Sequence, residues 1–202
     1  MKVSDDTELV TLQPDQPFFE TVYTPAPLVI VGTREPDGSD DLAPKHMAFP
    51  LGWSDRFGFV CTPEHSTYRN AERTGAFTVS YPRPENVLEA TLAAAPRDDE
   101  GDKPSLEGIE TDVADEVDAP VVSDAYAVLE CELDRTVDGF GSASLVAGEA
   151  VAKHVHSDAY RSDDDEPEDL FRRAPPLVYF YPDRFAEVDE TQAFPFPEGF
   201  SR

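Results

Sequence analysis

The residue types best suited to chemistry lie in a short segment that reads Ser66-Thr67-Tyr68-Arg69-Asn70. Ser66 is a typical helix-capping residue, and it predicts a helix over 67–74 that ends at Gly75. At the start of such a helix, free backbone N–H groups, the two hydroxyls and the guanidinium could converge on one phosphate. An ordinary capped helix with a surface arginine explains the same segment, and spacing alone leaves both interpretations open.

The surroundings of this segment are rich in positive charge, although the chain as a whole is strongly acidic. Lys and Arg number 16 against 42 Asp and Glu, which gives a formal net charge of −26. Between positions 42 and 71 the ionised side chains are Lys45, Arg56 and Arg69 against Asp55 and Glu64, with His46 and His65 in addition. A bound phosphate needs fixed donors and positive charge, so this window favours the anion-binding interpretation.

The acidic composition also limits the partners and the setting. Nucleic acids and anionic membranes would be repelled by most of this surface, so neither is expected as a partner. An excess of carboxylates with few lysines is typical of proteins from extreme halophiles, where salt screens the repulsion. We therefore expect a halophilic archaeal source, and an acidic mesophilic protein is the alternative.

Motifs for other chemistries are missing or weak. The chain has no dinucleotide-binding glycine fingerprint, no Walker loop and no nucleophile elbow, so we assign no catalytic residue. Cys61 and Cys131 lie in separate apolar runs and are expected to be buried free thiols. His154 and His156 lie two apart on a predicted strand and could ligate a metal, but a solvated strand edge is the favoured interpretation, so no metal is expected.

Short apolar runs punctuated by Gly and Pro predict a mainly β fold. Strands are expected at 28–33, 42–49, 56–61, 76–81, 125–137, 145–155 (broken at Gly148) and 177–181. Within 125–137, alternation places Ala127, Leu129 and Cys131 on the apolar side and Glu130 on the other side. Helices are expected at 18–23, 67–74 and 85–95. Because closure removes exposed sheet edges, we predict a β-barrel with flanking helices.

The chain is long enough for one sizeable core and short for two domains. We expect an acidic N-terminal arm at 1–16, a single domain at 17–190 and an aromatic, proline-rich tail at 191–202 that packs on its own subunit or on a partner. With no apolar span of 18 residues and no signal-peptide pattern at the N-terminus, a soluble cytoplasmic protein is expected.

An ordered series of short segments adds a family resemblance. The segments are Pro27–Arg34, Asp37-Gly38, Leu42-Ala43-Pro44, Thr67 with Asn70, Thr74–Val79, Lys103, Ala119-Pro120, Leu129-Glu130-Cys131, Gly148-Glu149 and Pro176–Tyr179. Together they resemble the flavin reductase-like proteins, which have an FMN-binding split β-barrel. Asp41 stands where this family often has Asn, and His46 stands where it often has Ser.

The resemblance implies a homodimer with FMN between the subunits, NADH or NADPH as electron donor, and in some members a partner monooxygenase. Carried over by position, the implied cofactor-binding residues are Asp41, Ala43, Lys45, His46, Met47, Cys61, Thr62, Ser66, Thr67, Arg69, Asn70 and Lys103. The expected function is hydride transfer from NAD(P)H, through bound FMN, to free flavin or another acceptor. Two alternatives remain, namely an FMN-binding electron carrier or flavin store without NAD(P)H turnover, and a barrel without flavin.

Overall fold

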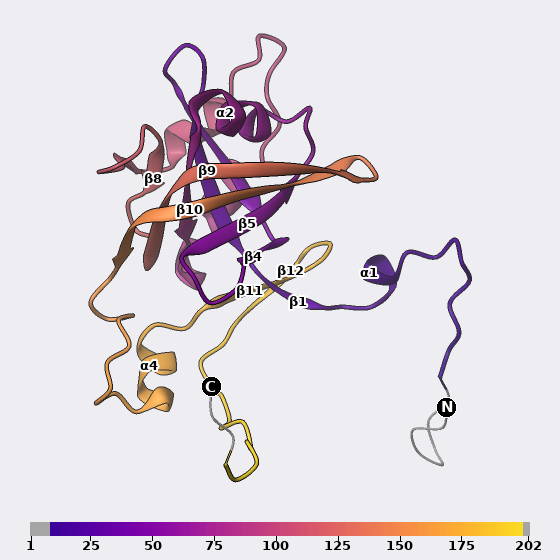
Figure 1. The fold of residues 1–202 in the computed structure, drawn as a ribbon, viewed down its shortest axis with the longest axis vertical. Coiled ribbons are helices and arrows are strands. Elements are labelled where there is room, and N and C mark those ends of the chain that lie inside the picture. Colours follow the sequence, from indigo (N-terminus) through magenta and orange to yellow (C-terminus); the bar gives the residue numbers. More distant parts are fainter. Residues whose placement is uncertain (1–8, 200–202) are drawn as a thin grey trace.

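A curled seven-stranded antiparallel sheet organises the protein (Figure 1). The computed structural model describes residues 9–199. The strand order in this sheet is β3-β2-β6-β9-β10-β5-β4, and every neighbouring pair is antiparallel. The predicted mainly β barrel with flanking helices is therefore confirmed.

The elements follow the chain with short connections. The strands of the large sheet are β2 (Val29–Arg34), β3 (Asp40–Lys45), β4 (Ala48–Pro50), β5 (Arg56–Cys61), β6 (Ala76–Tyr81), β9 (Ala127–Phe140) and β10 (Ala143–Val155). Two small sheets contain β1 (Pro25–Pro27) with β11 (Leu177–Phe180) and β12 (Arg184–Glu187), and β7 (Thr111–Val113) with β8 (Pro120–Val122). The helices are α1 (Phe18–Thr21), α2 (Ser66–Thr74), α3 (Val87–Ala93), α4 (Pro167–Arg173) and the 3₁₀ turns Pro84–Asn86 and Pro104–Gly108.

The two outermost strands of the large sheet are consecutive in the chain. Only His46 and Met47 separate the end of β3 from the start of β4, yet β3 pairs with β2 while β4 pairs with β5. The sheet must therefore curl back on itself so that its first and last strands meet at this corner. The corner lies within the segment that the sequence marks for anion binding.

Strand β2 separates two apolar cores and is buried on both faces. Val29 and Val31 point into the barrel interior with Phe59 and Phe77, all 0% exposed. Ile30, on the other face of β2, packs in a second cluster that includes Ala90 and Ala93 of α3. Burial on both sides explains why this strand is a continuous apolar run instead of an alternating pattern.

Helix α2 closes one side of the barrel. Tyr68 and Ala71 are buried and belong to the same cluster as the barrel interior. The helix ends at Gly75, whose φ of 73° lies in the left-handed region that favours glycine. The predicted end of this helix is confirmed, and its first turn is tied to β3 by the hydrogen bond from Thr67 to Asp41.

Most predicted elements are confirmed, and their errors have identifiable causes. The strands at 56–61 and 76–81 have the predicted bounds. Ser66 is the first helical residue instead of the cap, and the residue before it, His65, makes no side-chain capping bond. Gly148 does not break its strand, because β10 accommodates it with a register shift between Ala147 and Gly148.

Glu130 departs from the predicted pattern in a different way. Alternation places it on the polar side of its strand, yet it is 1% exposed. The segment that joins β7 to β8 folds over that face of the sheet and donates backbone N–H groups from Asp115, Glu116 and Val117 to the Glu130 carboxylate. The outer face of β9 is therefore covered at Glu130.

The two ends of the described chain lie outside the barrel (Figure 1). Phe18 and Phe19 in α1 are exposed and contact each other, as do Phe194 and Phe196 near the other end. The expectation that the tail packs on its own subunit or on a partner stays a prediction, and Phe200 and residues 1–8 of the arm fall outside the described residues. Within 9–199, no helix is long and apolar enough to cross a membrane.

The close approach of strands at Gly148 generates a stability prediction. A Cβ at this position would lie 2.7 Å from the Glu132 carbonyl oxygen and 2.7 Å from the buried Phe77 ring. Gly148→Ala should therefore lower the free energy of unfolding by about 1–3 kcal/mol, measured by chemical denaturation. Val151→Ala, at an exposed position of the same strand, is the matched control and should change it by less than about 0.5 kcal/mol. Equal effects in the two variants would contradict this account of the sheet.

Candidate functional site

A cavity of about 520 Å³, here called the cationic cavity, lies between the end of β3, the start of α2 and the segment after α3. Its lining comprises Asp41, Ala43, Pro44, Lys45, Glu64, His65, Ser66, Thr67, Arg69, Ala93, Ala94, Ala95, Pro96, Arg97 and Lys103. Three segments far apart in the chain therefore meet at one opening. The size suits a small organic ligand more than a single ion.

The first turn of α2 forms one wall of this cavity. His65 precedes the helix in an extended conformation with φ of −78° and ψ of 145°, and no side chain caps the helix. The first N–H groups of an α-helix have no acceptor within the helix and carry the positive end of its dipole. The Ser66 and Arg69 side chains line the cavity beside them. This wall can bind an anionic group.

The cations at this cavity differ from most others in the protein. Among residues 9–199, the Lys and Arg side chains without a carboxylate within 4.0 Å are Lys45, Arg69, Arg73, Lys103, Arg161 and Arg184. Lys45, Arg69 and Lys103 all line the cationic cavity. In a chain of net charge −26, three of the six unpaired cations of the described residues gather here, which indicates an anionic ligand.

Lys103 is positioned by backbone carbonyls. Its ammonium donates to the carbonyl oxygen of Leu42 at 2.7 Å and to that of Ala93 at 2.5 Å. These two bonds tie the long loop after α3 to both β3 and the end of α3. Burial lowers the pKa of Lys103, while the nearby carboxylate of Asp41 opposes that shift. Lys103 is therefore a half-buried donor at a fixed place in the wall.

A buried carboxylate forms the floor of the cavity. Asp41, 2% exposed, accepts hydrogen bonds from the Thr67 hydroxyl at 3.1 Å and the Thr33 hydroxyl at 3.4 Å. Its second oxygen accepts from the Arg97 guanidinium at 2.7 Å, and Arg97 also pairs with Glu35. The hydroxyl proton of Thr67 is therefore directed to Asp41, so this hydroxyl is left to act as an acceptor toward any ligand.

A second cavity of about 460 Å³, here called the aromatic cavity, adjoins the first. Pro44 and Ala94 line both of them. His46 lies in the aromatic cavity, with its ring centroid 5.1 Å from that of Tyr179 and stacked at 6.1 Å on Tyr181. Burial, and secondarily the charge of Lys45, lowers the pKa of His46. Together the two cavities offer positive charge at one end and aromatic surface at the other.

The structure brings together seven of the twelve residues that the family resemblance implies. Those lining the cationic cavity are Asp41, Ala43, Lys45, Ser66, Thr67, Arg69 and Lys103. The other five do not line it: His46 is in the aromatic cavity, Met47 is 50% exposed at the corner, Cys61 is buried in the core, Thr62 is half-buried before α2, and Asn70 is buried.

Two of these five, Asn70 and Cys61, have surroundings that bear on the site. Asn70 donates to the Thr33 hydroxyl at 3.3 Å, and this hydroxyl in turn donates to Asp41. Burial raises the pKa of the Cys61 thiol, although Lys45 nearby opposes the shift. Neither side chain lines the cationic cavity, and their role as cofactor ligands stays a prediction.

Sequence reasoning missed Arg97 and the segment 93–96 as parts of the lining. Arg97 follows Pro96, which ends the predicted helix at 85–95. A cation immediately after a helix-terminating proline was the one available signal. It is weak, because the contact of Arg97 with Asp41 spans 56 positions of the chain.

Comparison with known proteins identifies the family. The model of the flavin reductase-like domain matches residues 21–188, and the chain belongs to this family. Among solved structures, the chain resembles nitrilotriacetate monooxygenase component B from Bacillus cereus, with a TM-score of 0.78 and 18% identity over 93% of this chain and 100% of that one. It also resembles the flavoredoxin of Desulfovibrio vulgaris (Miyazaki F), with a TM-score of 0.75 and 21% identity over 95% of this chain and 100% of that one.

A third similar structure is an FMN-binding protein from Thermus thermophilus, with a TM-score of 0.72 and 18% identity over 93% of this chain and 99% of that one. At these identities the likeness shows the fold. The split barrel expected from the sequence is therefore confirmed.

The Asp41 floor generates a second prediction. Asp41→Ala would leave Arg97 and the Thr67 hydroxyl without their buried acceptor, which should lower the free energy of unfolding by about 3 kcal/mol. Asp41→Asn keeps an acceptor oxygen and should cost clearly less. Denaturation of both variants in molar salt measures the difference. Losses below about 0.5 kcal/mol in both would show that the floor does not hold the site together.

Proposed function

We propose that the protein is an FMN-dependent oxidoreductase that takes hydride from NADH or NADPH and delivers it to free flavin or another acceptor. The observation that carries the proposal is the gathering of unpaired cations at a cavity beside a helix N-terminus, next to an aromatic cavity. Membership of the flavin reductase-like family supports it.

The phosphate of FMN would bind in the cationic cavity. The N–H groups at the start of α2, the Ser66 hydroxyl and the Arg69 guanidinium supply donors on one side, and Lys45 supplies positive charge on the other. Because the Thr67 hydroxyl donates its hydrogen to Asp41, it would lie beside the phosphate without donating to it. Asp41 itself is a positioning residue, because it holds Thr67 and Arg97 in place.

The ring system would lie along the corner between β3 and β4. Ala43, Lys45, His46 and Met47 provide the surface there, and Lys103 would close the site from the long loop. Cys61 and Thr62 would flank the ring from β5 and the turn that follows it. The neighbouring rings of His46, Tyr179 and Tyr181 extend this surface with aromatic faces suited to a planar ligand.

Hydride transfer through FMN requires the chain to orient the cofactor more than to supply acid or base groups. When bound, FMN supplies the capacity to accept hydride and to release electrons. The residues of the chain bind the phosphate, hold the ring edge and leave one face open to nicotinamide.

Further parts of the proposal concern assembly and setting. Met47, Phe49 and fully exposed Trp53 lie at or near β4, the edge of the large sheet, and support a homodimer with the cofactor at the subunit interface. The similarity to a monooxygenase component B supports an oxygenase as partner. The charge of −26 supports a cytoplasm of high salt as the setting.

The decisive experiment begins with the visible spectrum of the protein purified in molar salt and mixed with FMN. Flavin bands that remain with the protein after desalting are expected, and their absence would refute both FMN-dependent functions. Anaerobic mixing with NADH and with NADPH should then bleach these bands. A protein that binds FMN and stays oxidised with both would be a flavin-binding carrier or store, the function suggested by its likeness to flavoredoxin.

The phosphate site generates a third prediction. Lys45→Ala and Arg69→Ala should each weaken FMN binding roughly tenfold, since each removes one charged partner of a phosphate. Fluorescence titration with FMN measures the dissociation constants. Arg135→Ala is the matched control, because this exposed arginine of β9 lies outside both cavities and should leave the constant unchanged. Unchanged affinity in both cavity variants would remove this wall from the phosphate site.

A further inference from the structure

A separate cavity of about 380 Å³ lies where the β7–β8 hairpin covers strands β9 and β10, and is here called the hairpin cavity. Its lining comprises Asp112, Val113, Ala114, Asp115, Val121, Val122, Ser123, Ala125, Val128, Glu130, His154, Val155 and His156. None of these residues lines the cationic or the aromatic cavity. The hairpin cavity therefore has no part in the proposed flavin site.

Glu130 places a buried negative charge in this cavity. Its side chain is 2% exposed, and no Lys or Arg of residues 9–199 lies within ion-pair distance of it. Burial alone would raise the pKa of Glu130, but hydrogen bonds from the N–H groups of Glu116 and Asp115, with His154 and Val117, outweigh this and lower it. Three backbone N–H groups therefore donate to this one carboxylate. Buried carboxylates are ordinarily paired with a cation or bound to a metal.

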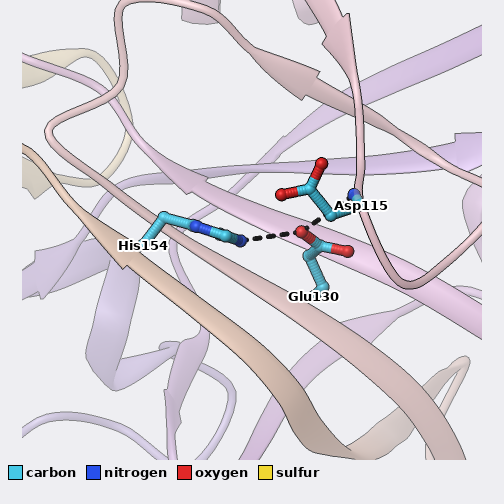
Figure 2. Close-up of side chains that lie close together, drawn as sticks. All are labelled: Asp115, Glu130 and His154. Carbon is cyan, nitrogen blue, oxygen red and sulfur yellow. Dashed lines mark hydrogen bonds and ion pairs between the residues drawn. The ribbon is translucent and has the colours of Figure 1, made fainter.

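His154 and Asp115, which come from two other segments, lie beside this charge (Figure 2). His154 of β10 has its Nε2 atom 2.9 Å from Oε1 of Glu130, and Asp115 comes from the segment between β7 and β8. One ligand atom from each of the three lies within 4.8 Å of the other two. The 2.9 Å separation is a hydrogen-bond distance, and only a small outward movement would give the spacing of about 3.0–3.4 Å between adjacent ligand atoms of one ion.

Two polar groups of the same cavity are left without partners. The Asp115 carboxylate is exposed and makes no hydrogen bond or ion pair with the described residues, because only its backbone N–H is engaged. The Ser123 hydroxyl oxygen is buried and has no hydrogen-bond partner in the described chain. Unsatisfied buried polar groups are costly, and here one lies in the cavity with the three converging side chains.

We propose that Asp115, Glu130 and His154 form a binding site for a divalent transition-metal ion of the Zn²⁺ or Co²⁺ type. The ion replaces the hydrogen bond between Nε2 of His154 and Oε1 of Glu130: the neutral imidazole binds it through Nε2 with its proton on Nδ1, and any proton displaced passes to water. The Asp115 carboxylate closes over the ion by rotating about its exposed side-chain bonds. Water completes the coordination from the open side of the cavity.

The donor set selects the class of ion. One imidazole nitrogen with two carboxylates suits a metal of borderline softness, whereas Ca²⁺ and Mg²⁺ favour oxygen ligands alone. No thiol is offered here, since both cysteines lie in the barrel core. A bound ion would stabilise the fold, because it joins the segment between β7 and β8 to β9 and β10, the two longest strands of the sheet.

The test uses the full chain without a histidine tag, treated with chelator and then desalted in molar KCl. Titration with CoCl₂ should give visible absorption bands that saturate at one ion per chain, and ZnCl₂ should displace Co²⁺ and raise the melting temperature. Asp115→Asn and His154→Ala should each weaken Co²⁺ binding at least about tenfold. Asp115→Asn changes an exposed side chain, so this variant is expected to fold even if a change at Glu130 does not.

Two matched controls line the same cavity and lie outside the cluster. Asp112→Asn removes a neighbouring exposed carboxylate, and His156→Ala removes an imidazole that bonds Asp158 instead. Both should bind Co²⁺ as tightly as the unaltered chain. If the unaltered chain does not bind Co²⁺, the contact between His154 and Glu130 is only a hydrogen bond within the chain, and the proposal is overturned. Equal binding by all four variants, or equal loss in all four, would also overturn it.

Discussion

The buried carboxylate of Asp41 is the contact on which the proposed site depends. It joins the hydroxyls of Thr33 on β2 and Thr67 on α2 to the guanidinium of Arg97 after α3. That shared acceptor holds the first turn of the helix and the segment after α3 to one place on the sheet. The cationic wall is therefore positioned by a negative charge beneath it. Arg97 in turn balances the buried charge of Asp41.

Local sequence patterns predicted most of the strands, because strand boundaries in this chain coincide with Gly, Pro and charged residues. The strand at 56–61 begins at Arg56 and ends before Thr62-Pro63, so its bounds could be read directly. Within the stretch 41–69, charge and local pattern pointed to Lys45, Ser66, Thr67 and Arg69, whereas Asp41 and Ala43 followed only from the family resemblance. The lining by Arg97 could not be predicted, because it depends on a distant ion pair with Asp41 and leaves no periodic trace.

Glu130 illustrates a different limit. Alternation correctly divides β9 into two faces, but it cannot reveal that another segment covers the polar one. The cover is the hairpin β7–β8 with its connecting segment, which comes from an acidic stretch with little apolar periodicity. Its backbone N–H groups, invisible to any side-chain pattern, make burial of the carboxylate acceptable. For the same reason the cluster with His154 and Asp115 appears only in three dimensions.

The cationic cavity set in an acidic surface has a kinetic consequence. An approaching anion meets repulsion from the overall charge of −26 at long range and attraction from Lys45 and Arg69 only near contact. The screening length is about 10 Å at 0.1 M salt and about 3 Å at 1 M. Concentrated salt therefore removes the distant repulsion while leaving much of the close attraction in place. For this protein, ionic strength speeds the encounter with an anionic ligand, the reverse of ordinary electrostatic steering.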